Sequence, residues 1–204
     1  TSEDFMLDNA DARSAVAGLI DPVARLLLRM GLSPDAVTWF GGIGVTVGAV
    51  VLIAPGHLLL GAAVCLIIGL SDLLDGTMAR LSDRVGSWGG FLDSTLDRVA
   101  DAALLGAIAW HFAASGADVW ALSAALIALG AAEVTSYIRA KAEAMGASCR
   151  IGLIERTERT GLIYGGLLLS GIHPLILPIT MVILAAGSAA TVVQRIAHVR
   201  RQLA

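Results

Sequence analysis

The chain has 204 residues, of which 56% are hydrophobic and 15% are charged, and its formal net charge at pH 7 is -3. A soluble domain averages about 45–50% apolar and about 25% charged residues, so this composition excludes a disordered chain, a coiled coil and an ordinary water-soluble domain. It indicates a protein that crosses a membrane several times, because water does not solvate so much apolar surface. Six of the 17 acidic residues lie between Asp72 and Asp101. That concentration needs an explanation, because carboxylates buried beside apolar spans are costly.

The N-terminal part of the chain is not apolar enough to span a bilayer. Residues Thr1–Phe5 are interpreted as a remnant outside the fold. Residues 10–30 carry charges between apolar residues at helical spacing, which predicts an amphipathic helix lying in the membrane interface, within a segment 6–33. Ser33 and Asp35 are both candidates to cap the helix that follows.

The remainder, residues 34–204, predicts an all-α membrane domain of six transmembrane helices. A helix needs about 20 apolar residues to cross a bilayer. The predicted spans lie at about 36–54, 57–75, 89–111, 118–138, 160–172 with its flank, and 175–194. The connections on one side hold 13 of the 14 Lys and Arg residues, and Arg98 is the exception. The positive-inside rule therefore places both termini and the long polar loops in the cytoplasm, with the protein in the cell membrane.

Four carboxylates flank the loop between the second and third predicted spans. Asp72 and Asp75 are three residues apart, and Asp93 and Asp97 are four apart, so each pair shares a helix face. The intervening loop is short, so the two helices should be antiparallel neighbours. We therefore expect the four carboxylates to converge near the membrane surface.

Converging carboxylates repel one another, and a divalent cation removes that conflict. Oxygen ligands favour Mg²⁺, Mn²⁺ or Ca²⁺, and a pair of such ions suits in-line displacement at phosphorus. The alternative is a set of salt bridges with Arg80, Arg84 and Arg98. Asp101 continues the series by another four residues, where it either pairs with Arg98 or supports the metal site from behind.

These residues form the pattern Asp-x2-Asp-Gly-x2-Ala-Arg-x8-Gly-x3-Asp-x3-Asp, from Asp72 to Asp97. The pattern resembles the signature of the CDP-alcohol phosphatidyltransferase family at every fixed position. The resemblance implies six spans, a homodimer, two metal ions (Mg²⁺, with Mn²⁺ possible) and transfer of a substituted phosphate from a CDP-linked donor to an alcohol, with release of CMP. No nucleic-acid partner is expected.

The resemblance also assigns roles to individual residues. It implies that Asp72, Asp75, Asp93 and Asp97 hold the metals and that Asp97 is the general base. Donor contacts are implied for Gly76, Ala79 and Arg80 in the signature, for Asp35 and Thr38 in a Pro-Asp-x-x-Thr element, and for Ser87 in the loop. Capping of a helix is an equally good explanation for Asp35.

A second cluster of charges bears on the identity of the acceptor. Arg139, Arg159 and Arg195 lie at predicted cytoplasmic helix ends, where they would form an anion pocket beside the metals for an acceptor with its own phosphate. Alternatively, they are topology signals and contacts to membrane lipids. Lys141 is a substitute ligand, because the related enzymes usually carry lysine at the position of Arg139.

Residues 136–141 and 155–159 resemble segments of the actinobacterial phosphatidylinositol-phosphate synthases, a branch of that family. This implies transfer from CDP-diacylglycerol to inositol phosphate, giving phosphatidylinositol phosphate and CMP. The alternatives are a phosphatidylglycerophosphate synthase, which uses glycerol 3-phosphate, and, remotely, an ion or metal transporter. Transport is disfavoured because the carboxylates gather at one end of their spans.

Overall fold

The structure is a computed structural model that describes residues 18, 20–83, 86–116 and 119–203. Every regular element in these residues is helical, so the prediction of an all-α protein is confirmed. The predicted remnant Thr1–Phe5 and the first part of the predicted 10–30 helix lie outside the described residues. The described part of that helix covers residues 20–29.

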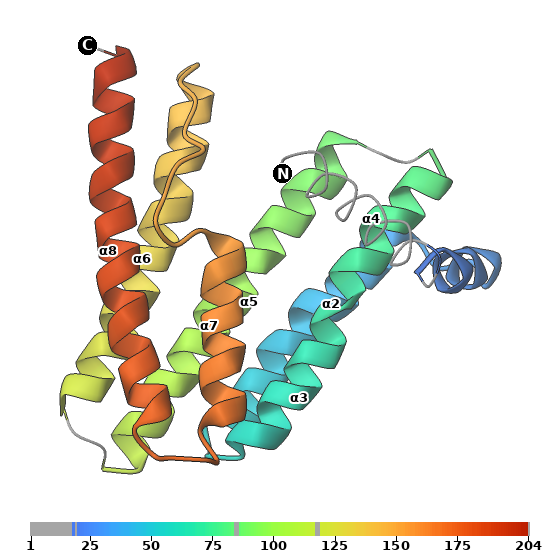
Figure 1. Cartoon of the computed structure of the whole chain (residues 1–204). Helices are drawn as coiled ribbons and strands as arrows, with labels where there is room; N and C mark the ends of the chain where they lie inside the picture. The colour runs from blue at the N-terminus through green and yellow to red at the C-terminus, as the bar shows by residue number, and fades with distance from the viewer. Residues whose placement is uncertain (1–17, 19, 84–85, 117–118, 204) are drawn as a thin grey trace, which may run out of the picture. The chain divides into compact units, whose positions relative to one another are not determined.

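The helices follow the predicted order along the chain (Figure 1). After the 20–29 helix they are α2 (Pro34–Gly48), the π-helical turn η1 (Ala49–Ile53), α3 (Leu58–Gly69), α4 (Ser71–Leu81), α5 (Ser87–Ala114), α6 (Val119–Ala144), α7 (Arg156–Leu169) and α8 (Ile176–Leu203).

Four helical segments are long and apolar enough to cross a membrane: Pro34–Ile53, Leu58–Leu81, Val119–Ala144 and Ile176–Leu203. The other two predicted spans correspond to α5 and α7. Charged residues from Asp93 to Asp101 make the first half of α5 polar, and α7 has only 14 residues, fewer than the roughly 20 that a bilayer requires. Length and composition therefore support a membrane protein with four candidate spans.

The described residues form two compact units. One contains the residues up to Gly44 together with Ile67–Asp97, and the other contains Val45–Leu66 together with the residues from Arg98 onward. The predicted metal residues all belong to the first unit, and the predicted acceptor residues all belong to the second.

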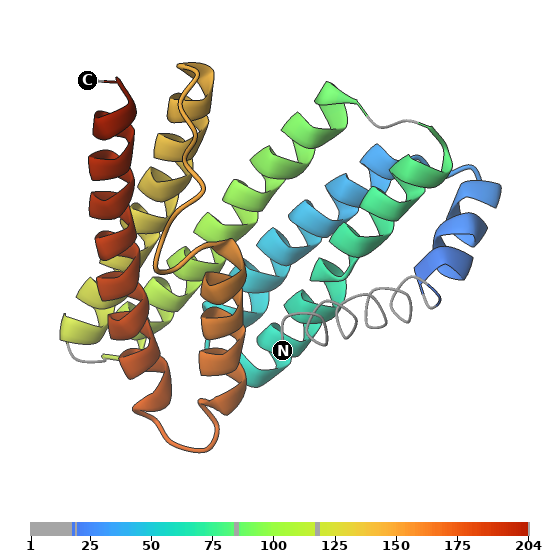
Figure 2. The same ribbon diagram turned by 45° about the horizontal axis from the view of Figure 1, so that its top comes forward.

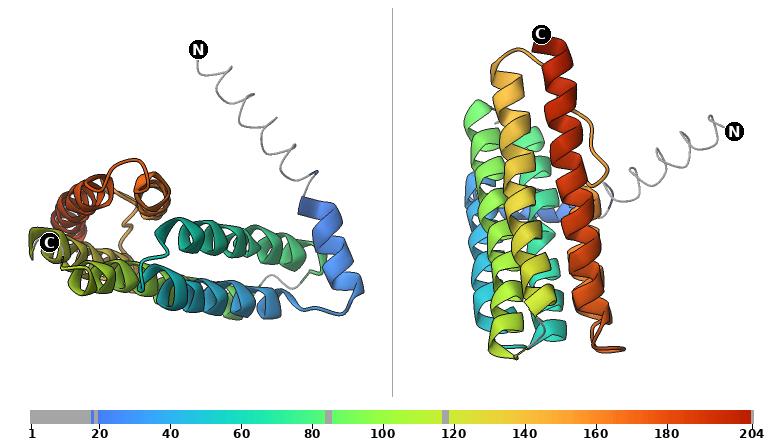
Figure 3. Two further views of the ribbon diagram at one scale, coloured as in Figure 1. Left: turned by 90° about the horizontal axis from the view of Figure 1, so that it is seen from below. Right: turned by 90° about the vertical axis from the view of Figure 1, so that its left-hand side faces the viewer.

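In the first unit, the 20–29 helix lies across the start of α2 and the end of α4 (Figure 3). Ala24 is fully buried and packs in a cluster with Val37 and Met78. At the start of α2, the backbone N–H of Ala36 donates to the Ser33 hydroxyl at 3.2 Å. Ser33 is thus the capping residue of the two predicted candidates, because a side-chain oxygen here satisfies an N–H group that has no partner within the helix.

The predicted span 57–75 consists of two helices, because α3 ends at Gly69 and α4 begins at Ser71. The break places Asp72 in the first turn of α4. Free N–H groups and the helix dipole favour negative charge at such a position. The interruption therefore stabilises a carboxylate in an otherwise apolar segment.

In the second unit, α6 and α8 pack side by side (Figures 1 and 2). The buried face of α6 is made of alanines, including Ala121, Ala124, Ala125, Ala128 and Ala132. Small side chains allow the backbones of neighbouring helices to approach closely. Two arginines from this unit, Arg159 and Arg195, are nevertheless buried.

Candidate functional site

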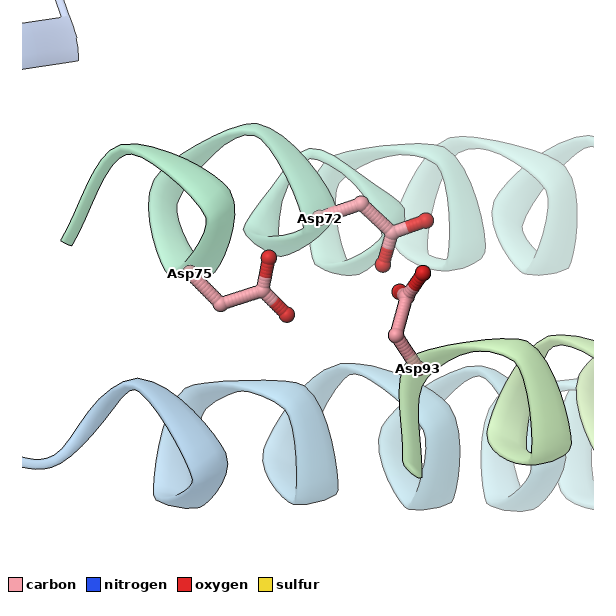
Figure 4. A group of neighbouring side chains, drawn as sticks. All are labelled: Asp72, Asp75 and Asp93. Atoms are coloured by element: carbon pink, nitrogen blue, oxygen red, sulfur yellow. The ribbon is translucent and has the colours of Figure 1, made fainter. Parts of the chain in front are cut away.

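Three of the four predicted metal ligands lie together in the first unit. Asp72 and Asp75 project from α4 toward Asp93 on α5, and Figure 4 shows the three carboxylates converging between the helices. One ligand oxygen from each residue lies within 4.8 Å of the others. The i, i+3 spacing on α4 and the position of Asp93 at the facing part of α5 produce this group, as the sequence predicts.

The environment of Asp75 fits a divalent cation. Its side chain is 7% exposed, and its Oδ2 has no hydrogen-bond partner among the described residues. The Gly76 N–H and the Thr38 hydroxyl interact with the same carboxylate, while Asp72 and Asp93 repel it. A buried, unpartnered carboxylate oxygen facing two further carboxylates is an unfavourable arrangement by itself. An oxygen-binding cation such as Mg²⁺ or Mn²⁺ would make it favourable.

Asp97 does not belong to this group of three within the described part of the chain. It lies one helical turn beyond Asp93 on α5, which places the two residues on the same face. Its predicted roles as a ligand and as a general base therefore remain predictions.

The residues predicted to contact the donor belong to the same unit as the carboxylates. Gly76, Ala79 and Arg80 lie on α4, and Arg80 is exposed, with its Nη2 donating to the Thr77 hydroxyl at 2.9 Å. Ser87 begins α5 and is exposed, and Thr38 is 8% exposed.

Asp35, in the first turn of α2, accepts a hydrogen bond from the indole Nε1 of Trp88 at 3.1 Å. Sequence analysis did not single out Trp88. No spacing rule connects a loop-end tryptophan to a carboxylate so distant in the chain.

Arg159 and Arg195 occupy buried positions in the second unit. Arg159 is 2% exposed, and its Nη2 donates to Oδ2 of Asp101 at 2.6 Å. The predicted pairing of Asp101 with Arg98 is also present, at 3.4 Å. Arg195 donates to the carbonyl oxygens of Thr135 and Ile151, both at 2.8 Å. The two arginines therefore differ, because Arg159 binds a carboxylate whereas Arg195 joins backbone segments.

The other two predicted acceptor residues lie at the exposed end of α6. Arg139 forms an ion pair with Glu143 at 3.0 Å, and both side chains are nearly half exposed. Lys141 is also exposed. An exposed pair of this kind contributes little to stability, so Arg139 is readily available to a ligand.

Glu133, which lies within the apolar α6, was not among the residues predicted from the sequence. Its Oε1 is buried without a hydrogen-bond partner in the described residues, and its charge interacts with those of Arg98, Asp101 and Arg159. The sequence could have singled out Glu133, because an isolated carboxylate inside a candidate span is functional by default.

The comparisons with known proteins agree with the signature. The family model described as CDP-alcohol phosphatidyltransferase matches residues 31–197. The phosphatidylinositol phosphate synthase of Streptomyces avermitilis is 38% identical over 96% of this chain and 84% of the relative. That of Cutibacterium acnes is 39% identical over 93% of this chain and 96% of the relative.

Solved structures of the Mycobacterium tuberculosis phosphatidylinositol phosphate synthase are similar to the whole fold. The structure with CDP-DAG bound has a TM-score of 0.87 at 39% identity and covers 90% of this chain and 94% of its own. The complex with manganese and citrate has a TM-score of 0.85 at 39% identity and covers 88% of both chains. Together with the matching family model and the convergent carboxylates, these similarities confirm the resemblance found in the sequence. The chain belongs to the CDP-alcohol phosphatidyltransferase family and is a membrane enzyme of that type.

Proposed function

We propose that this enzyme transfers the phosphatidyl group of CDP-diacylglycerol to a hydroxyl of inositol phosphate, giving phosphatidylinositol phosphate and CMP. The observation that carries the proposal is the group of Asp72, Asp75 and Asp93, held by α4 and α5 within the family signature. Its relatives at 38–39% identity are named phosphatidylinositol phosphate synthases, and one was solved with CDP-DAG. In the reaction, the acceptor oxygen forms a bond to the lipid-bearing phosphorus as the bond from that phosphorus to the CMP oxygen breaks.

Asp72, Asp75, Asp93 and Asp97 would hold two Mg²⁺ ions, with Mn²⁺ as a substitute. Bound ions of this kind neutralise phosphate charge and align the attacking and leaving oxygens. Asp97 would accept the proton of the acceptor hydroxyl. Asp97 lies one helical turn beyond Asp93 on α5, which supports a role for its carboxylate next to the ions.

The donor nucleotide would bind along α4 and the start of α2. Gly76 and Ala79 leave a helix face without bulky side chains, and the exposed Arg80 supplies a positive charge for the diphosphate. Asp35, Thr38 and Ser87 would complete the nucleotide contacts. Thr38 already lies at the Asp75 carboxylate, so donor binding and metal binding share one side chain.

The phosphate of the acceptor would bind to Arg159, assisted by Arg139, Arg195 and Lys141. Support for Arg159 comes from its Nε, which is buried and has no hydrogen-bond partner in the part of the chain that the structure describes. Arg139 and Lys141 are exposed and able to move toward an anion. This set of cations would favour a phosphorylated alcohol over inositol itself.

In the membrane, α5 and α7 would complete a six-span domain over residues 34–204, with the active site and both termini cytoplasmic. The 20–29 helix would lie in the interface, because Val23 and Leu26 on it, and Met30 directly after it, are exposed beside Arg25 and Arg29. Homodimerisation is part of the proposal and follows from the family resemblance.

An acceptor screen tests the function. Purified protein with CDP-diacylglycerol and Mg²⁺ is given inositol phosphate, glycerol 3-phosphate, inositol or serine, and CMP release is measured. We expect inositol phosphate to be used best, and preference for glycerol 3-phosphate would replace the proposed acceptor.

Arg159→Ala should raise KM for the phosphorylated acceptor far more than KM for CDP-diacylglycerol, whereas equal losses for both would remove Arg159 from the acceptor site.

A further inference from the structure

The buried guanidinium of Arg159 is held by Asp101. The Nη2 of Arg159 lies 2.6 Å from Oδ2 of Asp101, and the two residues are 2% and 5% exposed. Asp101 comes from α5 and Arg159 from α7, within the same compact unit. A short contact between a charged donor and a charged acceptor in such a position is a strong orienting interaction.

Asp101 is part of a balanced group of four charges. It also pairs with Arg98 at 3.4 Å, and Arg98 donates a hydrogen bond to Ser136 on α6. Glu133 lies close enough to interact with both arginines and with Asp101. Two positive and two negative charges thus share a largely apolar environment, where each charge needs its partners to remain in place.

The Nε–H of the Arg159 guanidinium is left for a ligand. The group is planar, and its five N–H donors have fixed relative directions. When Asp101 holds Nη2, the direction of the Nε–H is therefore also fixed. Nε is buried and without a hydrogen-bond partner in the described structure. Buried polar groups rarely lack a partner, and a site that binds an oxyanion accounts for the exception.

We propose that Asp101 is a positioning residue of the acceptor site: its carboxylate holds Nη2 of Arg159 so that the Nε–H of the same guanidinium meets the phosphate of the acceptor. The inference rests on the proposed function, because it assumes that the acceptor carries a phosphate. It gives Asp101 a different role from the support of the metal site considered in the sequence. Asp101 acts through Arg159 and does not itself contact the substrate.

The test is the steady-state kinetics of Asp101→Asn, which keeps the shape of the side chain and removes its charge. We expect KM for inositol phosphate to rise at least about tenfold, with kcat at saturating acceptor and KM for CDP-diacylglycerol nearly unchanged. Asp83→Asn is the matched control, because it makes the same change at an exposed loop carboxylate that has no proposed part in binding either substrate, and it should leave all three parameters unchanged. An unchanged or lowered acceptor KM in Asp101→Asn would overturn the proposal, since a lowered value means that Asp101 competes with the phosphate.

A double-mutant cycle with Arg159→Gln separates positioning from general structural damage. If Asp101 acts through Arg159, adding Asp101→Asn to Arg159→Gln should raise the acceptor KM no further. A rise in the double variant equal to the product of the two single-variant rises would contradict the proposal. If Asp101→Asn does not fold, Asp101→Glu replaces it, and retention of most of the acceptor affinity is then the expected result. Loss of that affinity in folded Asp101→Glu, as judged by normal CDP-diacylglycerol binding, would count against positioning by charge.

The wild-type acceptor screen tests the proposed function separately, and the cycle is measured with whichever phosphorylated acceptor the wild type uses. Equal use of inositol and inositol phosphate by the wild type would contradict both.

Discussion

The indole Nε1 of Trp88 donates a hydrogen bond to Oδ2 of Asp35 at 3.1 Å, and this bond joins residues 53 positions apart in the sequence. It ties the start of α5 to the first turn of α2 within one compact unit. If Asp35 contacts the nucleotide as proposed, this hydrogen bond from Trp88 would fix the direction of a donor-binding carboxylate. Trp88 itself is 59% exposed, which suits a role at the surface of the site.

Trp88→Phe should therefore affect the donor selectively. It keeps an aromatic ring and removes the N–H, so we expect a stability loss of no more than about 1 kcal/mol and a several-fold rise in KM for CDP-diacylglycerol. KM for the acceptor should not change. Trp110→Phe is the control, because Trp110 is exposed on the same helix far along the chain from the carboxylates. Equal kinetics of the two variants would show that the Asp35 hydrogen bond has no part in donor binding.

The position of Asp97 outside the group of three carboxylates gives a second prediction. Asp97→Asn should abolish CMP release while the protein still binds at least one Mn²⁺, because Asp72, Asp75 and Asp93 are intact. Asp75→Asn should lose both activity and metal binding, since it changes the buried member of the group. Mn²⁺ binding to the purified variants, measured by electron paramagnetic resonance, distinguishes them.

Metal removal completes that comparison. Treatment with a chelator should stop CMP release by the wild type, and Mg²⁺ or Mn²⁺ should restore it, whereas neither ion should restore Asp97→Asn. Substantial turnover by Asp97→Asn would remove its assignment as the base. Full turnover in the chelator would contradict the metal site as a whole.

Much of the first unit was predictable because its chemistry is local in the sequence. The i, i+3 spacing predicted that Asp72 and Asp75 share a face of α4, and the short loop predicted that Asp93 lies opposite them, as the structure shows. The break at Leu70 was not predictable, because residues 58–69 and the start of α4 read as one apolar run. Hydropathy reports that a segment is apolar but not where its hydrogen bonding is interrupted.

Long-range polar contacts were harder to predict. Pairing with Arg98, three residues away, was one of two alternatives predicted for Asp101, and the structure shows it. Its shorter contact to Arg159 spans 58 residues and depends on how α5 and α7 pack, which no local spacing encodes. The same holds for Arg195, whose sequence position indicated a cytoplasmic cation but not its contacts with two backbone carbonyl groups.

The close approach of α2 to α5 next to the carboxylates depends on glycine. A Cβ added to Gly42 would lie 2.7 Å from Cβ of Leu96, one residue before Asp97. Gly42→Ala should push the helices apart and cost about 1–3 kcal/mol of stability, with a loss of activity that exceeds the loss of folded protein. Gly106→Ala on α5 is the control, because nothing lies within 4 Å of its added Cβ. The measurements are thermal unfolding in detergent and CMP release per folded molecule. Equal behaviour of the two variants would show that helix spacing at Gly42 does not affect the site.

Arg195 joins α8 to two other segments of its unit. It is 3% exposed, and its Nη1 and Nε donate to the carbonyl oxygens of Thr135 and Ile151. Its Nη2 also lies 3.5 Å from Oε1 of Glu155. A lysine ammonium cannot reproduce this fork of donors, so Arg195→Lys should leave a buried carbonyl unpaired. We expect a stability loss of about 2 kcal/mol.

Thermal unfolding of detergent-solubilised Arg195→Lys measures this loss, and Arg200→Lys, an exposed conservative change on the same helix, is the control. Arg195→Lys should unfold at a lower temperature than both the wild type and the control. Addition of inositol phosphate should raise the unfolding temperature less in Arg195→Lys than in the wild type, because a ligand that binds more weakly stabilises the folded state less. An unchanged unfolding temperature combined with weaker acceptor binding would instead make Arg195 a phosphate ligand without a structural role.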